Sequence, residues 1–311
     1  LENSQLLREI NIPGLKTGKN GLEKSLNEEI IGIPGLQRFE VNAYGKRIKE
    51  LKYIQGKAGT NYRLTIDQEV QKYTSEMLKE KSGAVCVMDI YTGDIVVMVS
   101  SPTFDPNKFD PGISASDWEM LSNHPRNPLI NKSISGQYPP GSTFKMMVAL
   151  AALEAGVITP KSRIHCSGHI EFGDMKFHCW RNKFGHGSVN IYDAISQSCD
   201  VFFYEIALKT GINNIARISR EFGLGNHTGL NLPGERSGLI PDRDWKLKAK
   251  KLLWRPGETI IAGIGQGYVL VTPIQLALMT ARIANGGKKI VPTLLKTSCL
   301  LYTSPSPRDR G

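Results

Sequence analysis

The stretch that decides the fold is Gln137-Tyr138-Pro139-Pro140-Gly141-Ser142-Thr143-Phe144-Lys145, which continues directly into Met146-Met147-Val148-Ala149-Leu150-Ala151-Ala152-Leu153-Glu154-Ala155-Gly156. The second half is apolar on every side and rich in helix-forming residues, so it predicts a buried helix that ends at Gly156. Two prolines and Gly141 end an extended approach to this helix. We therefore expect Ser142 in the first helical turn.

Ser142 and Lys145 are three residues apart and so lie on one face of that helix. An amine beside a hydroxyl, inside an apolar wall, can lose its proton at neutral pH and act as a base for the serine. A Ser-x-x-Lys match is expected by chance about once in a chain of this length, and its ordinary interpretation is a surface cap with a solvated lysine. Its position on the one fully apolar helix favours a nucleophile and its base.

Composition sets broad limits on the function. The 311 residues are 40% hydrophobic and 22% charged, as in ordinary globular proteins. No run of eighteen apolar residues predicts a membrane span, and the chain opens at Leu1 without an initiating methionine or signal peptide, so we expect a fragment whose true N-terminus lies upstream. The net charge is +10, but the basic run Lys246–Lys251 lacks interleaved aromatic residues. This favours a solvated face over a nucleic-acid interface.

The first part of the chain predicts two hairpins. Phe39–Ala43 and Arg47–Leu51 are strand-like runs around the turn at Tyr44 and Gly45. A helical pattern follows over Gln68–Lys81. Two apolar, β-rich runs, 84–90 and 95–100, are then separated by a short loop that contains Gly93, which indicates a hairpin in a buried sheet.

The second part predicts helices around polar loops. Asn190 is placed to cap a helix over Ile191–Gln197, and Ser198-Cys199-Asp200 separates it from a second helix, Val201–Lys209. A polar triplet between two apolar helices is typical of a loop that points side chains into a cleft. Further on, Thr272–Gly286 has the cap, the Pro273 and the Asn-Gly end of a well-marked helix. Because no β-α-β pattern repeats, the sequence predicts an α+β fold.

Three motifs now stand in order: Ser142-x-x-Lys145, Ser198-x-Asp200, and the Gly265-Gln266-Gly267 loop before the Thr272 helix. In these motifs, and word for word in Tyr138–Lys145, the chain closely resembles the penicillin-binding transpeptidases. The best match is class B of the elongation type, the penicillin-binding protein 2 group, over nearly all of residues 10–295. The resemblance implies a penicillin-binding/serine β-lactamase-like domain, an antiparallel sheet flanked by helices, that cross-links peptidoglycan stem peptides and is acylated by penicillins.

The resemblance also implies a role for each motif residue. Ser142 would attack the penultimate D-Ala carbonyl, with its own backbone N–H as half of the oxyanion hole, and Lys145 would take the Ser142 proton. Ser198 would relay a proton to the leaving D-Ala and later accept one from the incoming amine. Asp200 stands where many relatives have Asn and would hold Lys145 by hydrogen bond and charge. No cofactor is implied for catalysis.

The family's third motif, Lys-Thr/Ser-Gly, should follow Ser198 by well over a hundred residues. The literal matches Lys16-Thr17-Gly18 and Lys209-Thr210-Gly211 do not qualify, since the first precedes Ser142 and the second ends a helix. We therefore expect a truncated transpeptidase domain over 61–298, incomplete at its C-terminal strands and poorly active or unstable alone. Residues 1–60 would be the C-terminal part of the N-terminal dimerisation or pedestal domain. Residues 299–311 change composition abruptly and resemble a non-native tail, with a disordered natural tail as the alternative.

Three cysteines and one histidine form a second candidate site. Cys166, Cys179, His186 and Cys199 gather in or just after one Cys/His/Gly-rich excursion, and three thiolates with one imidazole are a complete tetrahedral zinc set. The long spacings leave three interpretations open: a structural zinc that braces the Ser198 loop, a Cys166–Cys179 disulfide, or unlinked thiols.

Two other classes of function remain as alternatives. One is a class D β-lactamase or a β-lactam sensor domain, which share the Ser-x-x-Lys helix but lack the separate N-terminal domain. The other is a catalytically dead scaffold of the elongation machinery. Within the preferred family, the resemblance implies stem peptides ending in D-Ala-D-Ala and β-lactams as ligands. It also implies a glycan-polymerising membrane enzyme and elongation-complex proteins as partners, and no nucleic acid. The resemblance further implies a site at the periplasmic face of the inner membrane, held there by an anchor upstream of Leu1.

Overall fold

The computed structural model describes residues 16–110 and 112–296. These residues divide into two compact units. The smaller unit contains residues 16–64, 231–234 and 295–296, and the larger contains 65–230 and 235–294. The expected C-terminal tail, 299–311, lies outside the described residues.

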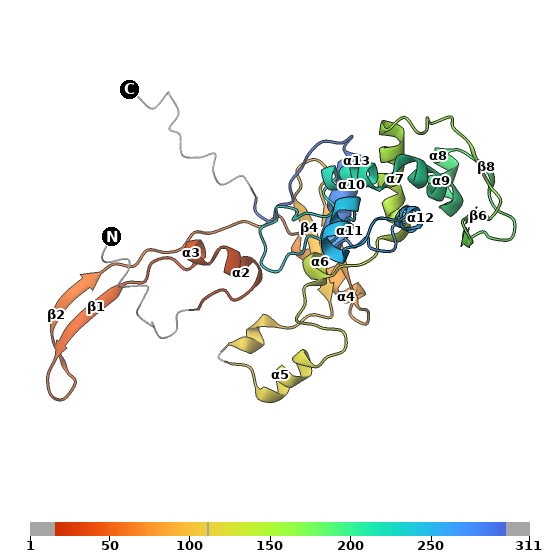
Figure 1. Cartoon of the computed structure of the whole chain (residues 1–311). Coiled ribbons are helices and arrows are strands. Elements are labelled where there is room, and N and C mark those ends of the chain that lie inside the picture. Colours follow the sequence, from red (N-terminus) through yellow and green to blue (C-terminus); the bar gives the residue numbers. More distant parts are fainter. Residues whose placement is uncertain (1–15, 111, 297–311) are drawn as a thin grey trace, which may run out of the picture. The chain divides into compact units, whose positions relative to one another are not determined.

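The smaller unit is built around one antiparallel hairpin, which Figure 1 shows in orange. Its strands are β1 (Leu36–Val41) and β2 (Arg47–Ile54), paired from Leu36 with Ile54 to Val41 with Arg47. The predicted strand pair around Tyr44 and Gly45 is therefore confirmed. Two short helices, α2 (Gly21–Ser25) and α3 (Asn27–Ile30), precede the hairpin.

The larger unit begins with the second predicted hairpin. Strands β3 (Gly83–Met88) and β4 (Ile95–Ser101) pair antiparallel, and alternate residues of β4 are buried. Helix α4 (Gln68–Met77) packs along β4 and is capped by Asp67, but it ends four residues before the predicted Lys81. The reason is local, since Leu78 and Lys81 form tight turn hydrogen bonds with the Thr74, Glu76 and Leu78 carbonyls in place of a continued helix.

Between β4 and the Ser142 segment, the chain contains three short helical pieces. They are η1 (Pro106–Phe109), α5 (Ala115–Ser122) and α6 (Lys132–Ser135), capped by Asp105, Ser114 and Asn131. Each cap accepts backbone N–H bonds of the first turn, which stabilises helices too short to show a hydrophobic period. Helix α6 packs against β3, β4 and α13 (Pro273–Ala284).

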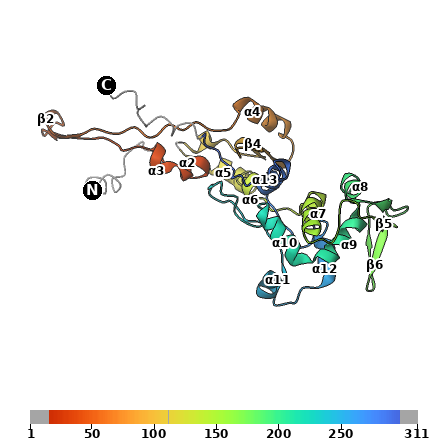
Figure 2. The same cartoon turned by 90° about the horizontal axis from the view of Figure 1, so that it is seen from above.

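The main core lies between helices of the larger unit. Helix α7 (Lys145–Glu154) packs against α9 (Asp200–Thr210) and α10 (Ile212–Glu221), and α9 also packs against α12 (Pro256–Ala262). Figures 1 and 2 agree in placing α7, α8 (Ile191–Ser196) and α9 side by side. The completely buried side chains of this core include Phe144, Met147, Phe202, Phe203, Ile206 and Ile260. Burial of α7 follows the prediction from its all-round apolar sequence.

Beside these helices lies an excursion of four short strands in two antiparallel pairs. They are β5 (Ile164–Cys166) with β8 (Gly187–Val189), and β6 (His169–Phe172) with β7 (Met175–His178). All four paired strand sets of the described residues are antiparallel, in agreement with the predicted α+β class. None of the helices in the described part of the chain is both long and apolar enough to cross a bilayer.

The expectation of a solvated basic face at Lys246–Lys251 was partly wrong. Helix α11 (Arg243–Lys250) begins before this run and contains most of it, and Lys246 is buried on the helix. Its ammonium donates to Glu258 and lies over the Trp254 ring. The sequence of the run alone gave no sign of a partner, because Glu258 is twelve residues away on α12.

Candidate active site

Ser142 lies at the end of an anchored approach. Tyr138 pairs with Val271 by two backbone hydrogen bonds, and the Gly141 N–H donates to the Gly265 carbonyl at 3.0 Å. Gly265 has φ +71°, and a Cβ at this position would overlap the Gly141 carbonyl oxygen. A glycine is therefore required in the predicted Gly-Gln-Gly loop, and this loop fixes the backbone just before the nucleophile.

The sequence predicted that Ser142 lies in the first turn of an α-helix, but this turn has a different geometry. Residues Gly141–Phe144 form a 3₁₀ turn, η2, which continues into α7 at Lys145. The tighter turn still puts Ser142 and Lys145 on one side, because side chains three residues apart eclipse in a 3₁₀ geometry. Ser142 is exposed whereas Lys145 is only 2% exposed, so the hydroxyl faces solvent and the amine lies inside the protein.

Ser198 and Asp200 come from the junction between α8 and α9. Ser198 has a φ of +53°, a conformation that non-glycine residues rarely adopt. The turn is held by the Cys199 N–H, which donates to the Ala194 carbonyl at 2.9 Å. Cys199 is the N-cap of α9, and Asp200 is its first residue. Strained backbone of this kind is concentrated at functional sites, where the surroundings hold it in place.

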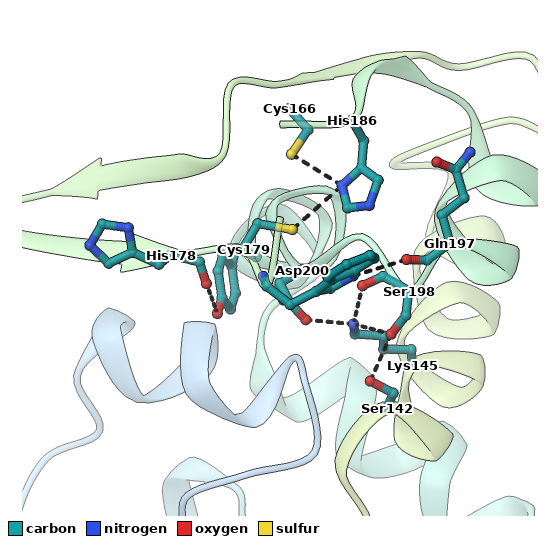
Figure 3. Close-up of polar contacts among 11 residues, drawn as sticks. Ser142, Lys145, Cys166, His178, Cys179, His186, Gln197, Ser198 and Asp200 are labelled. Atoms are coloured by element: carbon teal, nitrogen blue, oxygen red, sulfur yellow. Dashed lines mark hydrogen bonds and ion pairs between the residues drawn. The ribbon is translucent and has the colours of Figure 1, made fainter. Parts of the chain in front are cut away.

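These segments bring all four predicted catalytic residues together (Figure 3). The Ser142 Oγ lies 2.8 Å from the Ser198 Oγ. The Lys145 Nζ lies 3.0 Å from that same Ser198 Oγ, 3.0 Å from the Ser198 carbonyl oxygen and 2.6 Å from the Asp200 Oδ1. Ser198 therefore bridges Ser142 and Lys145, an arrangement that the spacing of Ser142 and Lys145 alone did not predict.

The ammonium of Lys145 has three N–H groups, and the structure gives it three acceptors. Asp200 provides the charge partner through Oδ1, while its Oδ2 accepts from the Trp180 backbone N–H at 2.9 Å. Both oxygens of this mostly buried carboxylate are thus used. Sequence reasoning missed the Trp180 contact, and the available signal was its position next to Cys179, a predicted metal ligand.

The nucleophile opens onto a cavity of about 330 Å³. Its lining includes Ser142, Asp200, Trp180, Tyr204, Ile264 and Gln266. Tyr204 is held by its hydroxyl, which donates to the His178 carbonyl at 3.1 Å, and burial raises the pKa of that phenol. The hydroxyl of Ser142 is therefore exposed to a hollow large enough for a peptide or bicyclic acyl donor, with the amine behind it.

The second predicted cluster also assembles. The three cysteine Sγ atoms and a ring nitrogen of His186 all lie within 4.8 Å of one another. His186 Nδ1 is 3.6 Å from the Cys166 Sγ and 3.5 Å from the Cys179 Sγ (Figure 3). Cys166 comes from β5, Cys179 from the end of β7 and Cys199 from the cap of α9, so the cluster joins the excursion to the helix that carries Asp200.

This cluster fits a tetrahedral metal ion. The four donor types match a structural zinc site, in which ligand atoms at Zn–S distances near 2.3 Å are separated by roughly 3.8 Å. Burial raises the pKa of the Cys179 and Cys199 thiols and lowers that of His186, which favours the neutral forms of these three groups in the absence of a cation. His186 presents Nδ1 to the sulfurs, and its buried Nε2 has no hydrogen-bond partner among the described residues. The structure has Cys166 and Cys179 as free thiols, not as the alternative disulfide.

Neither literal Lys-Thr-Gly triplet lies at this site. Lys209 and Thr210 end helix α9, Gly211 caps it, and the Lys209 ammonium bonds to Glu205 on the surface. Lys16-Thr17-Gly18 belongs to the smaller unit. The structural interpretation of both triplets agrees with the prediction.

Comparison with known families identifies the family of this chain. Residues 83–308 match the family model described as "Penicillin binding protein transpeptidase domain", and residues 4–64 match "Penicillin-binding Protein dimerisation domain". The chain belongs to the penicillin-binding transpeptidases. The predicted family and fold class are thereby confirmed. Members of this family need no cofactor for catalysis. The first match also includes most of the stretch that we expected to be a non-native tail.

Individual relatives narrow the similarity to one branch. The chain is 39% identical over 283 residues to the peptidoglycan D,D-transpeptidase MrdA of Escherichia coli K12, covering 90% of this chain and 44% of MrdA. A complex between penicillin-binding protein PBP2 and MreC from Helicobacter pylori matches with a TM-score of 0.83 and 37% identity, over 93% of this chain and 53% of the other.

A second similar structure is described as "Structural coordination of polymerization and crosslinking by a peptidoglycan synthase complex". It matches with a TM-score of 0.83 and 33% identity, over 94% of this chain and 53% of the other. The family-branch prediction, the penicillin-binding protein 2 group, is confirmed by these relatives. The chain spans about half the length of the curated relatives and structures that it matches.

Proposed function

We propose that this chain belongs to a serine-type peptidoglycan D,D-transpeptidase that cross-links stem peptides during cell elongation, through an acyl-enzyme on Ser142. The observation that supports this most is the hydrogen-bonded series Ser142–Ser198–Lys145–Asp200 in a transpeptidase-family fold. An exposed hydroxyl, a buried amine and a cavity that opens onto the hydroxyl are the parts that acyl transfer needs.

The geometry supports a proton path through Ser198. When Lys145 is neutral, its Nζ lone pair can accept the Ser198 hydroxyl proton while Ser198 Oγ accepts the Ser142 proton. Ser142 Oγ then forms a bond to the carbonyl carbon of the D-Ala-D-Ala donor. Collapse of the tetrahedral intermediate breaks the amide bond, and the leaving amine of D-Ala takes a proton back through Ser198. An acceptor amine attacks the ester by the reverse sequence.

Asp200 has a positioning role in this proposal. Its carboxylate holds the Lys145 amine at 2.6 Å and is itself held by the Trp180 N–H. The lysine therefore cannot swing toward solvent, and its remaining directions point to Ser198. Orientation of a general base by a third group is the arrangement found in other serine enzymes.

A labelled penicillin tests the proposal on the protein expressed from its complete reading frame. We expect one equivalent of label to bind covalently, to remain bound for many minutes, and to be lost in Ser142→Ala. Rapid turnover of the penicillin would instead indicate the β-lactamase alternative. No labelling of a folded protein would favour the scaffold alternative and overturn the proposed activity.

We also propose that Cys166, Cys179, His186 and Cys199 hold a structural zinc ion. The support is the convergence of three sulfurs and one imidazole within 4.8 Å, with His186 Nδ1 facing the Cys166 and Cys179 sulfurs at 3.6 and 3.5 Å. Zinc would supply charge neutralisation for three thiolates and would fix the excursion to the start of α9, next to Asp200. Its role would be structural, since no ligand of the cluster belongs to the proposed proton path.

Metal analysis of the purified protein tests the zinc proposal. We expect about one equivalent of zinc per chain. A strong chelator should release this zinc, and the freed cysteine thiols should then react with a thiol reagent. Less than about a tenth of an equivalent would remove the idea. A chain mass lower by two hydrogen atoms, with Cys166 and Cys179 peptides linked to each other, would favour the disulfide alternative in its place.

The domain roles, the partners and the location follow as further proposals. Residues 1–60 would end the dimerisation or pedestal domain and 61–298 would form the transpeptidase domain, supported by the division of the structure at 64 and 65. The titles of the similar structures, one with MreC and one of a peptidoglycan synthase complex, support elongation proteins and a glycan-polymerising enzyme as partners. The site would face the periplasm at the inner membrane, where this cell-wall substrate is found.

A further inference from the structure

Trp180 is a large aromatic side chain exposed beside the nucleophile. Its relative exposure is 65%, and it lines the same cavity as Ser142 and Asp200. No step of the proposed proton path uses its indole ring. An exposed indole that lines a cavity beside a reactive hydroxyl offers a broad apolar face to a bound ligand.

The ring is nevertheless held in one orientation. Its Nε1–H donates to the Gln197 carbonyl at 3.0 Å, and its backbone N–H donates to the Asp200 Oδ2 at 2.9 Å. The ring edge also contacts His186 in a T-shaped arrangement with centroids 5.4 Å apart. These contacts fix the indole from the residues on both sides of Ser198, so its orientation relative to the cavity is set before a ligand arrives.

We infer that the indole face of Trp180 is a specificity-determining surface for the acyl donor. It would select donors that carry an apolar or aromatic group beside the reacting carbonyl. This inference rests on the proposed acylation of Ser142. The chemistry follows from the lining of the cavity. Ser142, Asp200 and Gln266 supply polar groups, while Trp180 supplies a broad, pre-oriented apolar face that loses little conformational entropy when it is covered.

Two penicillins that differ only in the group beside the β-lactam carbonyl provide the probe. One carries a phenylacetamido side chain, and the other is 6-aminopenicillanic acid, which has a bare amine. Second-order acylation rates are measured for the wild type, Trp180→Ala and Trp180→Phe, on the protein from its complete reading frame. Phe184→Ala serves as the matched control, because Phe184 is an 83% exposed aromatic in the same loop that does not line the cavity.

We expect Trp180→Ala to slow acylation by the phenylacetamido penicillin about tenfold and to change the rate with 6-aminopenicillanic acid less than about twofold. Trp180→Phe keeps an aromatic face and the backbone N–H, so it should recover most of the selectivity. Phe184→Ala should leave both rates unchanged.

Other outcomes overturn the inference. An equal loss with both penicillins would make Trp180 a brace for the Ser198 loop, not a contact surface. Unchanged selectivity in Trp180→Ala would exclude the contact directly. If the wild type reacts with neither reagent, the proposed acylation itself fails, which separates that failure from a failure of the Trp180 inference.

Discussion

The two polar clusters of the larger unit are both built from four side chains, yet they differ in how complete they are. The Ser142, Lys145, Ser198 and Asp200 cluster satisfies its own hydrogen bonds, since all three donors of Lys145 and both oxygens of Asp200 have partners. The Cys166, Cys179, His186 and Cys199 cluster brings three sulfurs and a ring nitrogen within 4.8 Å of one another, and its contacts include weak sulfur–nitrogen ones at 3.5 and 3.6 Å.

This difference indicates that the stability of the first cluster depends on its own members, whereas that of the second depends on a bound ion. A self-satisfied cluster is stable without a ligand and is disrupted by removal of one member, because a buried group is then left alone. An unsatisfied cluster depends on something added, and a cation that converts thiols to thiolates would complete it. The two clusters meet at Cys199-Asp200, so the effect of a change in one cluster on the other can be measured.

The largest expected effect comes from breaking the self-satisfied cluster. Lys145→Met removes the proposed base and leaves the Asp200 carboxylate without its cation. We expect Ser142 acylation by a labelled penicillin to fall at least about 1000-fold and stability to fall by roughly 3 kcal/mol. The matched control is Lys209→Met, an exposed lysine paired with Glu205, for which denaturation should show a change below about 0.5 kcal/mol. Near-normal acylation of Lys145→Met would rule out its role as base.

The next effect tests the cluster that needs an addition. Removal of the metal by a chelator, or Cys166→Ser, should lower the thermal unfolding midpoint by about 10 °C, because the metal ties the excursion to α9. Cys86→Ser is the matched control, since Cys86 is half-buried on β3 outside the cluster, and it should unfold within about 2 °C of the wild type. Equal midpoints with and without chelator would contradict a structural metal.

An intermediate effect probes the junction between the clusters. In Asp200→Asn, the single amide oxygen can accept from only one of the two donors, Lys145 Nζ or the Trp180 N–H. The amide NH₂ then faces the remaining donor, so that hydrogen bond is lost. We expect acylation to slow about tenfold, with the metal content unchanged. If zinc is lost together with acylation, the two clusters are more tightly linked than their separate hydrogen bonds indicate.

The smallest effect concerns an ion pair that belongs to neither cluster. Burial opposes ionisation of Asp242, but the Trp245 backbone N–H and the Arg220 guanidinium outweigh it and hold the pKa of Asp242 below its usual range. A lowered pKa in the folded state stabilises the protein above the unfolded pKa, and this contribution is lost as the pH falls through the folded pKa. Asp242→Asn keeps a good N-cap for α11 and should lose less than about 1 kcal/mol at pH 7.

Urea denaturation at several pH values checks this last prediction. The difference between Asp242→Asn and the wild type should shrink as the pH falls below about 4, where the unfolded carboxyl is protonated. A difference that stays constant down to the lowest pH would show that the substitution acts through the cap and not through the charge.

The sequence was most informative where residues close together in the chain determine the local structure. Asn190 and Thr272 cap their helices as predicted, and the apolar run after Lys145 is the buried helix α7. Lys246 and the short helices of 106–135 were missed or misjudged, because Glu258 is distant in the chain and short capped helices show no hydrophobic period.

The sequence by itself determined the Ser142–Lys145 spacing, the capped helices, the glycine loop and the set of possible metal ligands. Only the tertiary structure decided that Ser198 lies between Ser142 and Lys145, and that Trp180 holds the far oxygen of Asp200. The physical reason is that caps and helical faces depend on neighbours within four residues. The site depends on packing of α7 against α9, whose residues are more than fifty positions apart.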